Sequence, residues 1–134
     1  MYVTDHLGRV DHVEGRWEPT TAADVAEHRN KHQQSIAGKP DRLTGDVGGH
    51  LIAASGAGAG EGINLIALRD TINGAGGDYG KMEAEIRNIA SQQPGAQIEL
   101  VIDLGYPGSS RRPDQIDIDV LVDGQLAGRV DFAQ

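Results

Sequence analysis

The sequence predicts an α+β fold with a mostly antiparallel sheet. Segments with the two-residue apolar alternation of β-strands lie on both sides of one strongly amphipathic helix, expected over residues 78–92. The connections between strands are short, and Asp123-Gly124 is a strong two-residue hairpin turn. Short connections join antiparallel neighbours, so we expect a mostly antiparallel sheet with this helix packed over it and other helices flanking it.

Residues 1–19 predict a hairpin followed by a linker. Tyr2–Thr4 and Val10–Val13 are short β-prone runs, and the loop between them carries a glycine where a turn needs one. Residues 16–19, which end at a proline, are expected to form the linker.

A helix is expected over residues 21–35, between a start that resembles a capping box and the helix-terminating Gly38 and Pro40. Its apolar side is thin, so it should lie outside and pack weakly. His28 and His32 have a spacing that can bind zinc on a helix, but the glutamate of an H-E-x-x-H motif is missing. We therefore interpret them as part of a solvated face.

A hairpin is expected in the middle of the chain, with strands over 48–54 and 63–68. The glycine-rich loop at 55–62 fits no phosphate-binding register, and it leads to a strand rather than to a helix. A hairpin connection is the better interpretation. The helix at 78–92 follows, with Asp78 as its expected cap and one apolar face toward the core.

Three strands are expected after this helix, over 97–104, 116–122 and 126–132. Asp117 and Asp119 alternate with isoleucines, and the pattern of a calcium loop fails beyond them. They should lie on the solvated side of an antiparallel sheet.

Length and composition limit the classes of protein. The 134 residues suit a single domain, 1–134, and the absence of cysteine excludes disulfides and thiolate metal sites. The chain contains no run of about 18 apolar residues, so no membrane span is predicted. The N-terminus shows no secretory signal peptide. The net charge of −8 weighs against nucleic-acid binding, unless a divalent cation and a local cluster of arginines offset it.

His50 is the strongest candidate for chemistry. It follows Gly48 and Gly49, which would let a substrate backbone approach closely, and it opens an apolar run. Asn73 and Glu83 follow at a distance that suits strand, hairpin and helix, so three polar groups are expected to converge in the shape of a one-metal nuclease site. The alternative is a structural histidine beside an apolar strand.

The central segment is similar to a known family. The matching features are Asp46-Val-Gly-Gly-His50-Leu-Ile-Ala, Asn64-Leu, Asn73 and Met82-Glu83. They resemble the DNA/RNA non-specific endonucleases of the ββα-metal class, in particular the branch found as C-terminal toxin domains of bacterial secreted proteins. The resemblance extends from Gln33 to the final hairpin, whereas residues 1–30 are less informative.

The resemblance implies a role for each of five residues. His50 would be the general base, Asn73 the direct metal ligand, and Glu83 a group that holds the metal's water shell or orients Asn73. Asn64 would support the site from the second strand, and Asp46 would orient the loop before His50. The implied cofactor is Mg²⁺ (or Mn²⁺), and contacts to phosphate and sugar imply weak sequence preference.

One departure from the family concerns the arginine that would neutralise the negative charge of the transition state. Many relatives carry an arginine shortly before the Gly-His pair, where this chain has Val47. Arg42, Arg111 and Arg112 are then the candidates for substrate binding, and the sequence does not choose between them.

The resemblance implies a metal-dependent, sequence-nonspecific endonuclease that hydrolyses DNA or RNA and acts as an antibacterial toxin. Such a domain would be secreted or delivered into the cytoplasm of a target cell, and its producer would need an immunity protein, here with a basic or mixed contact surface because the toxin is acidic. Two alternatives remain: a catalytically inactive member of the fold that works as a binding or assembly module, and an unrelated small acidic domain.

Overall fold

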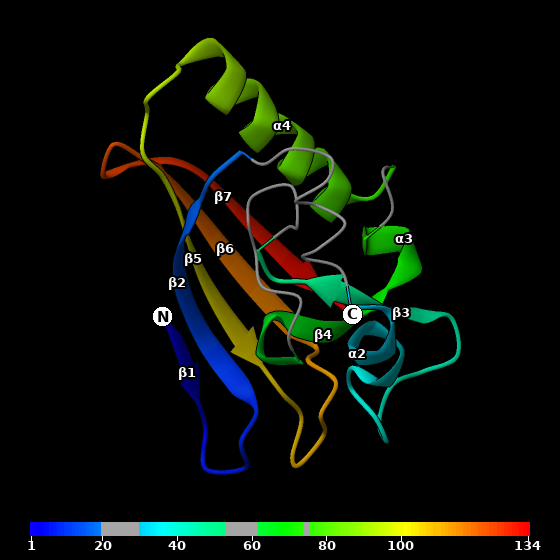
Figure 1. The fold of residues 1–134 in the computed structure, drawn as a ribbon. Coiled ribbons are helices and arrows are strands. Elements are labelled where there is room, and N and C mark those ends of the chain that lie inside the picture. Colours follow the sequence, from blue (N-terminus) through cyan, green and yellow to red (C-terminus); the bar gives the residue numbers. More distant parts are fainter. Residues whose placement is uncertain (20–29, 53–61, 74–75) are drawn as a thin grey trace.

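The structure is a computed structural model that describes residues 1–19, 30–52, 62–73 and 76–134 (Figure 1). Its strands are β1 (Tyr2–Thr4), β2 (Val10–Trp17), β3 (Asp46–His50), β4 (Leu65–Arg69), β5 (Ile98–Gly105), β6 (Gln115–Val122) and β7 (Gln125–Ala133). Its helices are α2 (Lys31–Ile36), the 3-10 turn η2 (Gly62–Asn64), α3 (Asp70–Asn73) and α4 (Asp78–Gln92). None of these described helices is long and apolar enough to cross a bilayer.

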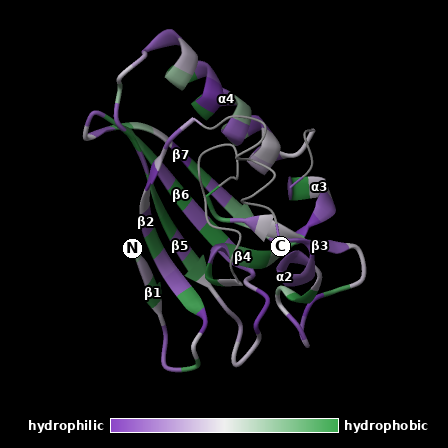
Figure 2. Cartoon of the chain, viewed as in Figure 1, coloured by the Kyte–Doolittle hydropathy of each residue, from purple (hydrophilic) through white to green (hydrophobic). Residues whose placement is uncertain are grey.

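Five strands form one antiparallel sheet in the order β1-β2-β5-β6-β7. Alternate residues of the long strands point to opposite faces, which gives the striped hydropathy of Figure 2. In β5 the buried positions are Ile98, Leu100, Ile102 and Leu104. The predicted strands after α4 are confirmed, and Asp123 and Gly124 form the predicted turn with φ values of 51° and 80°.

The second layer consists of the antiparallel β3–β4 pair and helix α4. Tyr79, Met82 and Ile86 of α4 are buried in the same cluster as the inner residues of the large sheet. The Tyr79 and Phe132 rings lie 5.7 Å apart between their centroids, so α4 is anchored on β7. This confirms the predicted α+β class and the predicted place of helix 78–92.

Helix α2 packs on the other face of the β3–β4 pair. A Cβ built on Gly48 would lie 2.3 Å from the backbone oxygen of Gln34, so the helix backbone rests directly on the strand. On the same face, a Cβ built on Gly38 would lie 2.3 Å from the Cβ of Ala67. The β3–β4 pair is therefore enclosed between α2 and the main core.

Four element boundaries differ from the sequence predictions. The strand expected at 48–54 is β3 at Asp46–His50, and the strand expected at 63–68 is β4 at Leu65–Arg69, because the chain first forms η2. The N-cap of α4 is Gly77, and Asp78 is the first helical residue. Residues 16–19 are not all linker, since β2 continues to Trp17, whose side chain is buried in the core.

Some predictions fall outside the described residues. The helix expected at 21–35 is not continuous, because α2 begins only at Lys31, with Asn30 in an extended conformation as its N-cap; residues 20–29 with His28 are not described. The glycine-rich loop at 55–62 is described only at Gly62.

The outer face of the large sheet carries a row of charged residues across four strands. His12, Asp103, Asp117 and Asp131 are consecutive partners across β2, β5, β6 and β7. The hydrogen bonds of His12 to Asp103 and then to Glu14 raise its pKa, and the hydrogen bond between Asp131 and Asp117 raises the pKa of Asp131. The prediction that Asp117 and Asp119 lie on the solvated side is confirmed, because they alternate with the buried residues of β6.

Candidate active site

His50 is the last residue of β3 and lies opposite Leu65, the first residue of β4. Its side chain is partly buried, and its backbone oxygen accepts a hydrogen bond of 2.8 Å from the Tyr79 hydroxyl of α4. The same hydroxyl lies 2.5 Å from the backbone oxygen of Leu51. Helix α4 therefore holds, through Tyr79, the backbone oxygens of the candidate base and of the residue after it.

Sequence reasoning missed Tyr79. It lies four residues before Glu83, on the same face of α4, and this spacing is the signal that could have identified it. Burial, and after it the negative charge of Glu83, raises the pKa of the Tyr79 phenol well above its ordinary value. The phenol stays protonated, as a hydrogen-bond donor must, and the Glu83 carboxylate lies close enough to act on it electrostatically.

Asn73 meets β3 at Gly49. A Cβ built on Gly49 would lie 3.1 Å from the Asn73 Oδ1 atom and 2.9 Å from Leu68 Cδ2. The absence of a side chain at Gly49 thus makes room for the candidate metal ligand next to His50. The two glycines before His50 were expected to admit a substrate backbone, but at Gly48 and Gly49 the space is occupied by Gln34, Leu68 and Asn73.

Gly77 brings Asn73 close to α4. A Cβ built on Gly77 would lie 2.3 Å from the backbone oxygens of both Thr71 and Ile72, so α3 and α4 meet with their backbones in contact. The N-terminus of α4, with Tyr79 and Glu83 in its first turns, therefore lies beside the helix that ends at Asn73. Asn73 is thus linked to the strand of His50 through Gly49, and Glu83 through Tyr79.

We expect Gly77→Ala to destabilise the fold by about 1–3 kcal/mol, as overpacking against a rigid neighbour does. The carbonyls of α3 cannot rotate away as a side chain could, so α3 and Asn73 must move. Gly128→Ala is the matched control, because a Cβ there meets nothing within 4 Å. Urea unfolding of both variants checks this, and a Gly77→Ala protein as stable as the control would show that α3 and α4 are not in backbone contact.

Asn64 is fully buried at the turn into β4. Its Oδ1 accepts hydrogen bonds of 3.0 Å from Tyr2 Oη and from the Ile52 amide, and its Nδ2 donates to the Ile52 oxygen at 2.9 Å. These contacts fix the chain just after His50 and tie it to β1. In this geometry Asn64 acts on His50 through the backbone of Leu51 and Ile52.

Asp46 begins β3 and pairs with Arg112 from the β5–β6 connection. Arg112 Nε lies 2.6 Å from Oδ2 and Nη2 lies 3.1 Å from Oδ1, and the two side chains are only 9% and 3% exposed. Burial alone would raise the pKa of Asp46, but the hydrogen bonds from Arg112 and from the Leu43 amide outweigh it and lower the pKa. The pair fixes the start of the strand that ends at His50.

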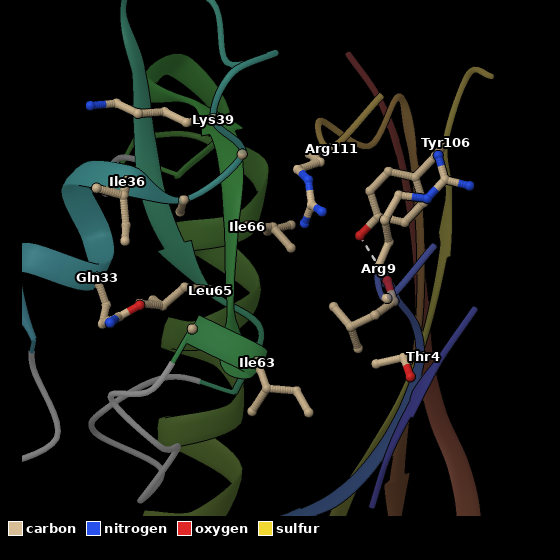
Figure 3. A pocket seen from close by; sticks show the side chains of 15 residues that line it. Thr4, Arg9, Gln33, Ile36, Lys39, Ile63, Leu65, Ile66, Tyr106 and Arg111 are labelled. Atoms are coloured by element: carbon tan, nitrogen blue, oxygen red, sulfur yellow. Dashed lines mark hydrogen bonds between the residues drawn. The ribbon is translucent and has the colours of Figure 1, made fainter. Parts of the chain in front are cut away.

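The three candidate arginines occupy different environments. Arg42 donates hydrogen bonds to the backbone oxygens of Gln34, Ser35 and Asp46, so it joins α2 to β3. Arg112 is engaged by Asp46. The side chain of Arg111 is exposed and lies along a cavity beside β4, with its backbone amide held by Asp41 (Figure 3).

Comparison with known proteins identifies the family of this chain. The family model for DNA/RNA non-specific endonucleases matches residues 1–124, which include every described element except β7. The chain is also 30% identical over 129 residues to the type VII secretion system protein EssD of Staphylococcus aureus, in strains USA300 and NCTC 8325. The alignment covers 93% of this chain and 20% of that protein, so the chain spans about one fifth of the length of these relatives. Since the family match begins at residue 1 and takes in both N-terminal strands as well as the hairpin of His50, the chain belongs to the DNA/RNA non-specific endonuclease family.

Proposed function

We propose that this chain is a metal-dependent, sequence-nonspecific endonuclease that hydrolyses phosphodiester bonds of DNA, RNA or both. The observation that carries the proposal is the placement of three polar residues around the end of β3. His50 lies at that end, Asn73 packs on the neighbouring Gly49, and Glu83 acts on the phenol that holds the His50 backbone. The family membership supports the reaction type.

In this mechanism the neutral imidazole of His50 takes the proton from the attacking water. Tyr79 donates to the backbone oxygen of the base and Asn64 holds the backbone that follows it, so the imidazole is positioned before substrate arrives. Asp46 and Arg112 fix the other end of the strand. Of the candidate arginines, Arg111 is the best placed to contact substrate, because Arg112 is neutralised by Asp46 and Arg42 is engaged by backbone oxygens.

The donor atoms of the site fit a hard cation. Asn73 supplies an amide oxygen and Glu83 a carboxylate, which are ligands that Mg²⁺ and Mn²⁺ take together with water. Among the described residues no three His, Cys, Asp or Glu side chains gather to form a fuller cage. We propose that Asn73 binds the ion directly and that Glu83 holds its water shell. When bound, the ion would neutralise charge on the phosphate and on the leaving oxygen.

We expect cleavage of plasmid DNA and of RNA to stop in excess EDTA and to return with Mg²⁺ or Mn²⁺. Asn73→Ala should need at least about tenfold more Mg²⁺ for half-maximal rate, because even partners outside the coordination sphere change metal affinity by about 10–100-fold. Asn88→Ala, on the exposed side of α4, is the matched control. A rate that is unchanged in EDTA would exclude a metal-dependent mechanism. A folded protein that is inactive with both ions would favour the alternative that the chain is a catalytically inactive binding module, which its net charge of −8 also favours.

The relatives suggest the biological setting. Because the chain spans one fifth of proteins named for type VII secretion, we propose that residues 1–134 form the nuclease domain of a secreted toxin that acts in the cytoplasm of a target cell. A producer of such an enzyme needs protection, so we propose a cognate immunity protein. Its contact surface would be basic or mixed, to match the acidic residues of this chain.

A further inference from the structure

A cavity of about 480 Å³ lies beside the candidate active site, between the second layer and the first two strands. One wall comes from α2 and the residues after it, with Ile36 and Lys39, and the opposite wall comes from Arg9 and Tyr106 (Figure 3). Leu65 and Ile66 of β4 line it as well, and Leu65 is the cross-strand partner of His50. The cavity is thus adjacent to the strand end that carries the candidate base.

The charge of this cavity differs from that of the whole chain. The chain has 20 acidic and 12 basic residues, yet the described lining includes Arg9, Lys39 and Arg111 and not a single acidic side chain. Arg9 is held by Asp5 and stacks on the Tyr106 ring at 4.6 Å, so it forms a fixed wall. Arg111 and Lys39 form no ion pair with any described carboxylate. Arg111 points into the space between Ile66 and Tyr106 (Figure 3).

The same cavity presents apolar surface. Ile36 and Ile63, which are 38% and 40% exposed, line it on opposite sides of β4, where Leu65 extends the side of Ile36 and Ile66 the side of Ile63 (Figure 3). Cations beside an open apolar wall fit a ligand with an anionic group on a flat, weakly polar body, as in a nucleotide. The volume also lies within the range of about 300–1,000 Å³ that is typical of small-molecule sites.

We propose that this cavity binds one unpaired nucleotide of the substrate strand next to the scissile phosphate, with its base against Ile63 and its phosphate toward Arg111, which lie on the same side of β4 (Figure 3). The inference rests on the proposed nuclease function and specifies its substrate class. A base that enters the cavity must leave its stack, so single-stranded DNA or RNA is the preferred substrate and a duplex is cut only where it opens.

Binding tests the proposal without catalysis. The parent is the His50→Ala protein in EDTA, and the probe is a fluorescein-labelled hexathymidylate at low salt, followed by anisotropy. Arg111→Ala should weaken binding at least about tenfold, and Arg87→Ala, the same charge change on the exposed side of α4, by less than about threefold. Thr4→Trp fills the cavity from its exposed rim without a change of charge and should also weaken binding about tenfold. Circular dichroism confirms that each variant is folded.

A second measurement compares rates. With Mg²⁺, the otherwise unaltered protein should cut a single-stranded oligonucleotide at least about tenfold faster than the matching duplex, and Thr4→Trp should reduce this ratio toward one. The proposal is overturned if the parent does not bind the probe, if Thr4→Trp binds as the parent does, or if the two arginine variants weaken binding equally. A protein without nuclease activity would refute the proposed function, and the binding measurement would still decide the cavity.

Discussion

His50→Ala is expected to lose at least about 100-fold in the rate of nucleic-acid cleavage, the low end of what a general base contributes. The fold should survive. The side chain is partly exposed, and the contact that ties this residue to α4 is made by its backbone oxygen, which alanine retains. The measurement is the initial rate of cleavage with Mg²⁺ at neutral pH, with thermal unfolding of both proteins as the check on folding.

His12→Ala is the matched control for this variant. His12 is also a histidine in a strand, but its ring lies on the outer face of the large sheet, bonded to Asp103 at 2.6 Å and Glu14 at 3.1 Å. The rate of His12→Ala should equal that of the unaltered protein. If His50→Ala remains folded and cuts as fast as the unaltered protein, His50 is not the base. The metal-binding roles proposed for Asn73 and Glu83 then lose their support.

Arg112→Ala is expected to destabilise the protein by about 3 kcal/mol, because it leaves the Asp46 carboxylate buried without its partner. The Asp46 side chain is only 3% exposed, so water cannot replace both hydrogen bonds from Arg112. The value lies at the low end of the range of about 3–5 kcal/mol for broken buried pairs, since the Leu43 amide continues to donate to Asp46. Urea unfolding at neutral pH measures the change.

Arg129→Ala provides a control with nearly identical bonding. Arg129 Nε and Nη2 reach Asp119 at 2.6 Å and 3.1 Å, but this pair lies on the surface with 61% and 31% of the two side chains exposed. Its removal should cause no resolvable change, because exposed ion pairs contribute little. Equal losses in the two variants would contradict the view that burial, rather than geometry, gives the Asp46 pair its importance.

The effect of Arg112→Ala should also depend on pH. The pKa of Asp46 is lowered in the folded protein, so its contribution to stability is present above the ordinary aspartate value of about 3.9 and is lost as the pH falls through the folded-state pKa. The difference in unfolding free energy between the unaltered protein and Arg112→Ala should therefore narrow below about pH 4.

The sheet strands and the main helix could be predicted because their signals are local. The alternation in β5 and β6 and the apolar face of α4 repeat at the spacing of each element, and Asp123-Gly124 encodes its own turn. The boundary at β4 could not be predicted in this way. Asn64 interrupts the apolar run because its amide bonds to Ile52, twelve residues away, and the chain forms η2 before the strand begins.

The site was predictable in its order along the chain but not in its contacts. His50, Asn73 and Glu83 could be selected from type and spacing, whereas the pairing of Asp46 with Arg112 joins residues 66 positions apart and leaves no local pattern. Gly49 illustrates the same limit. A glycine before a histidine indicates that something approaches the backbone closely, but only the tertiary structure shows that Asn73 does so.

The row of charged residues on the outer face of the large sheet affects which side of the molecule repels a polyanion. Electrostatic fields at physiological ionic strength are screened over about 8 Å, and stacked layers of a domain lie about 10 Å apart, so the two sides of the protein act as separate surfaces at short range. The row of His12, Asp103, Asp117 and Asp131 belongs to one side, and the proposed nucleotide cavity, whose described lining has no carboxylate, belongs to the other. This separation places the cavity away from that row of carboxylates. The net charge is therefore a poor measure of the surface that the strand meets.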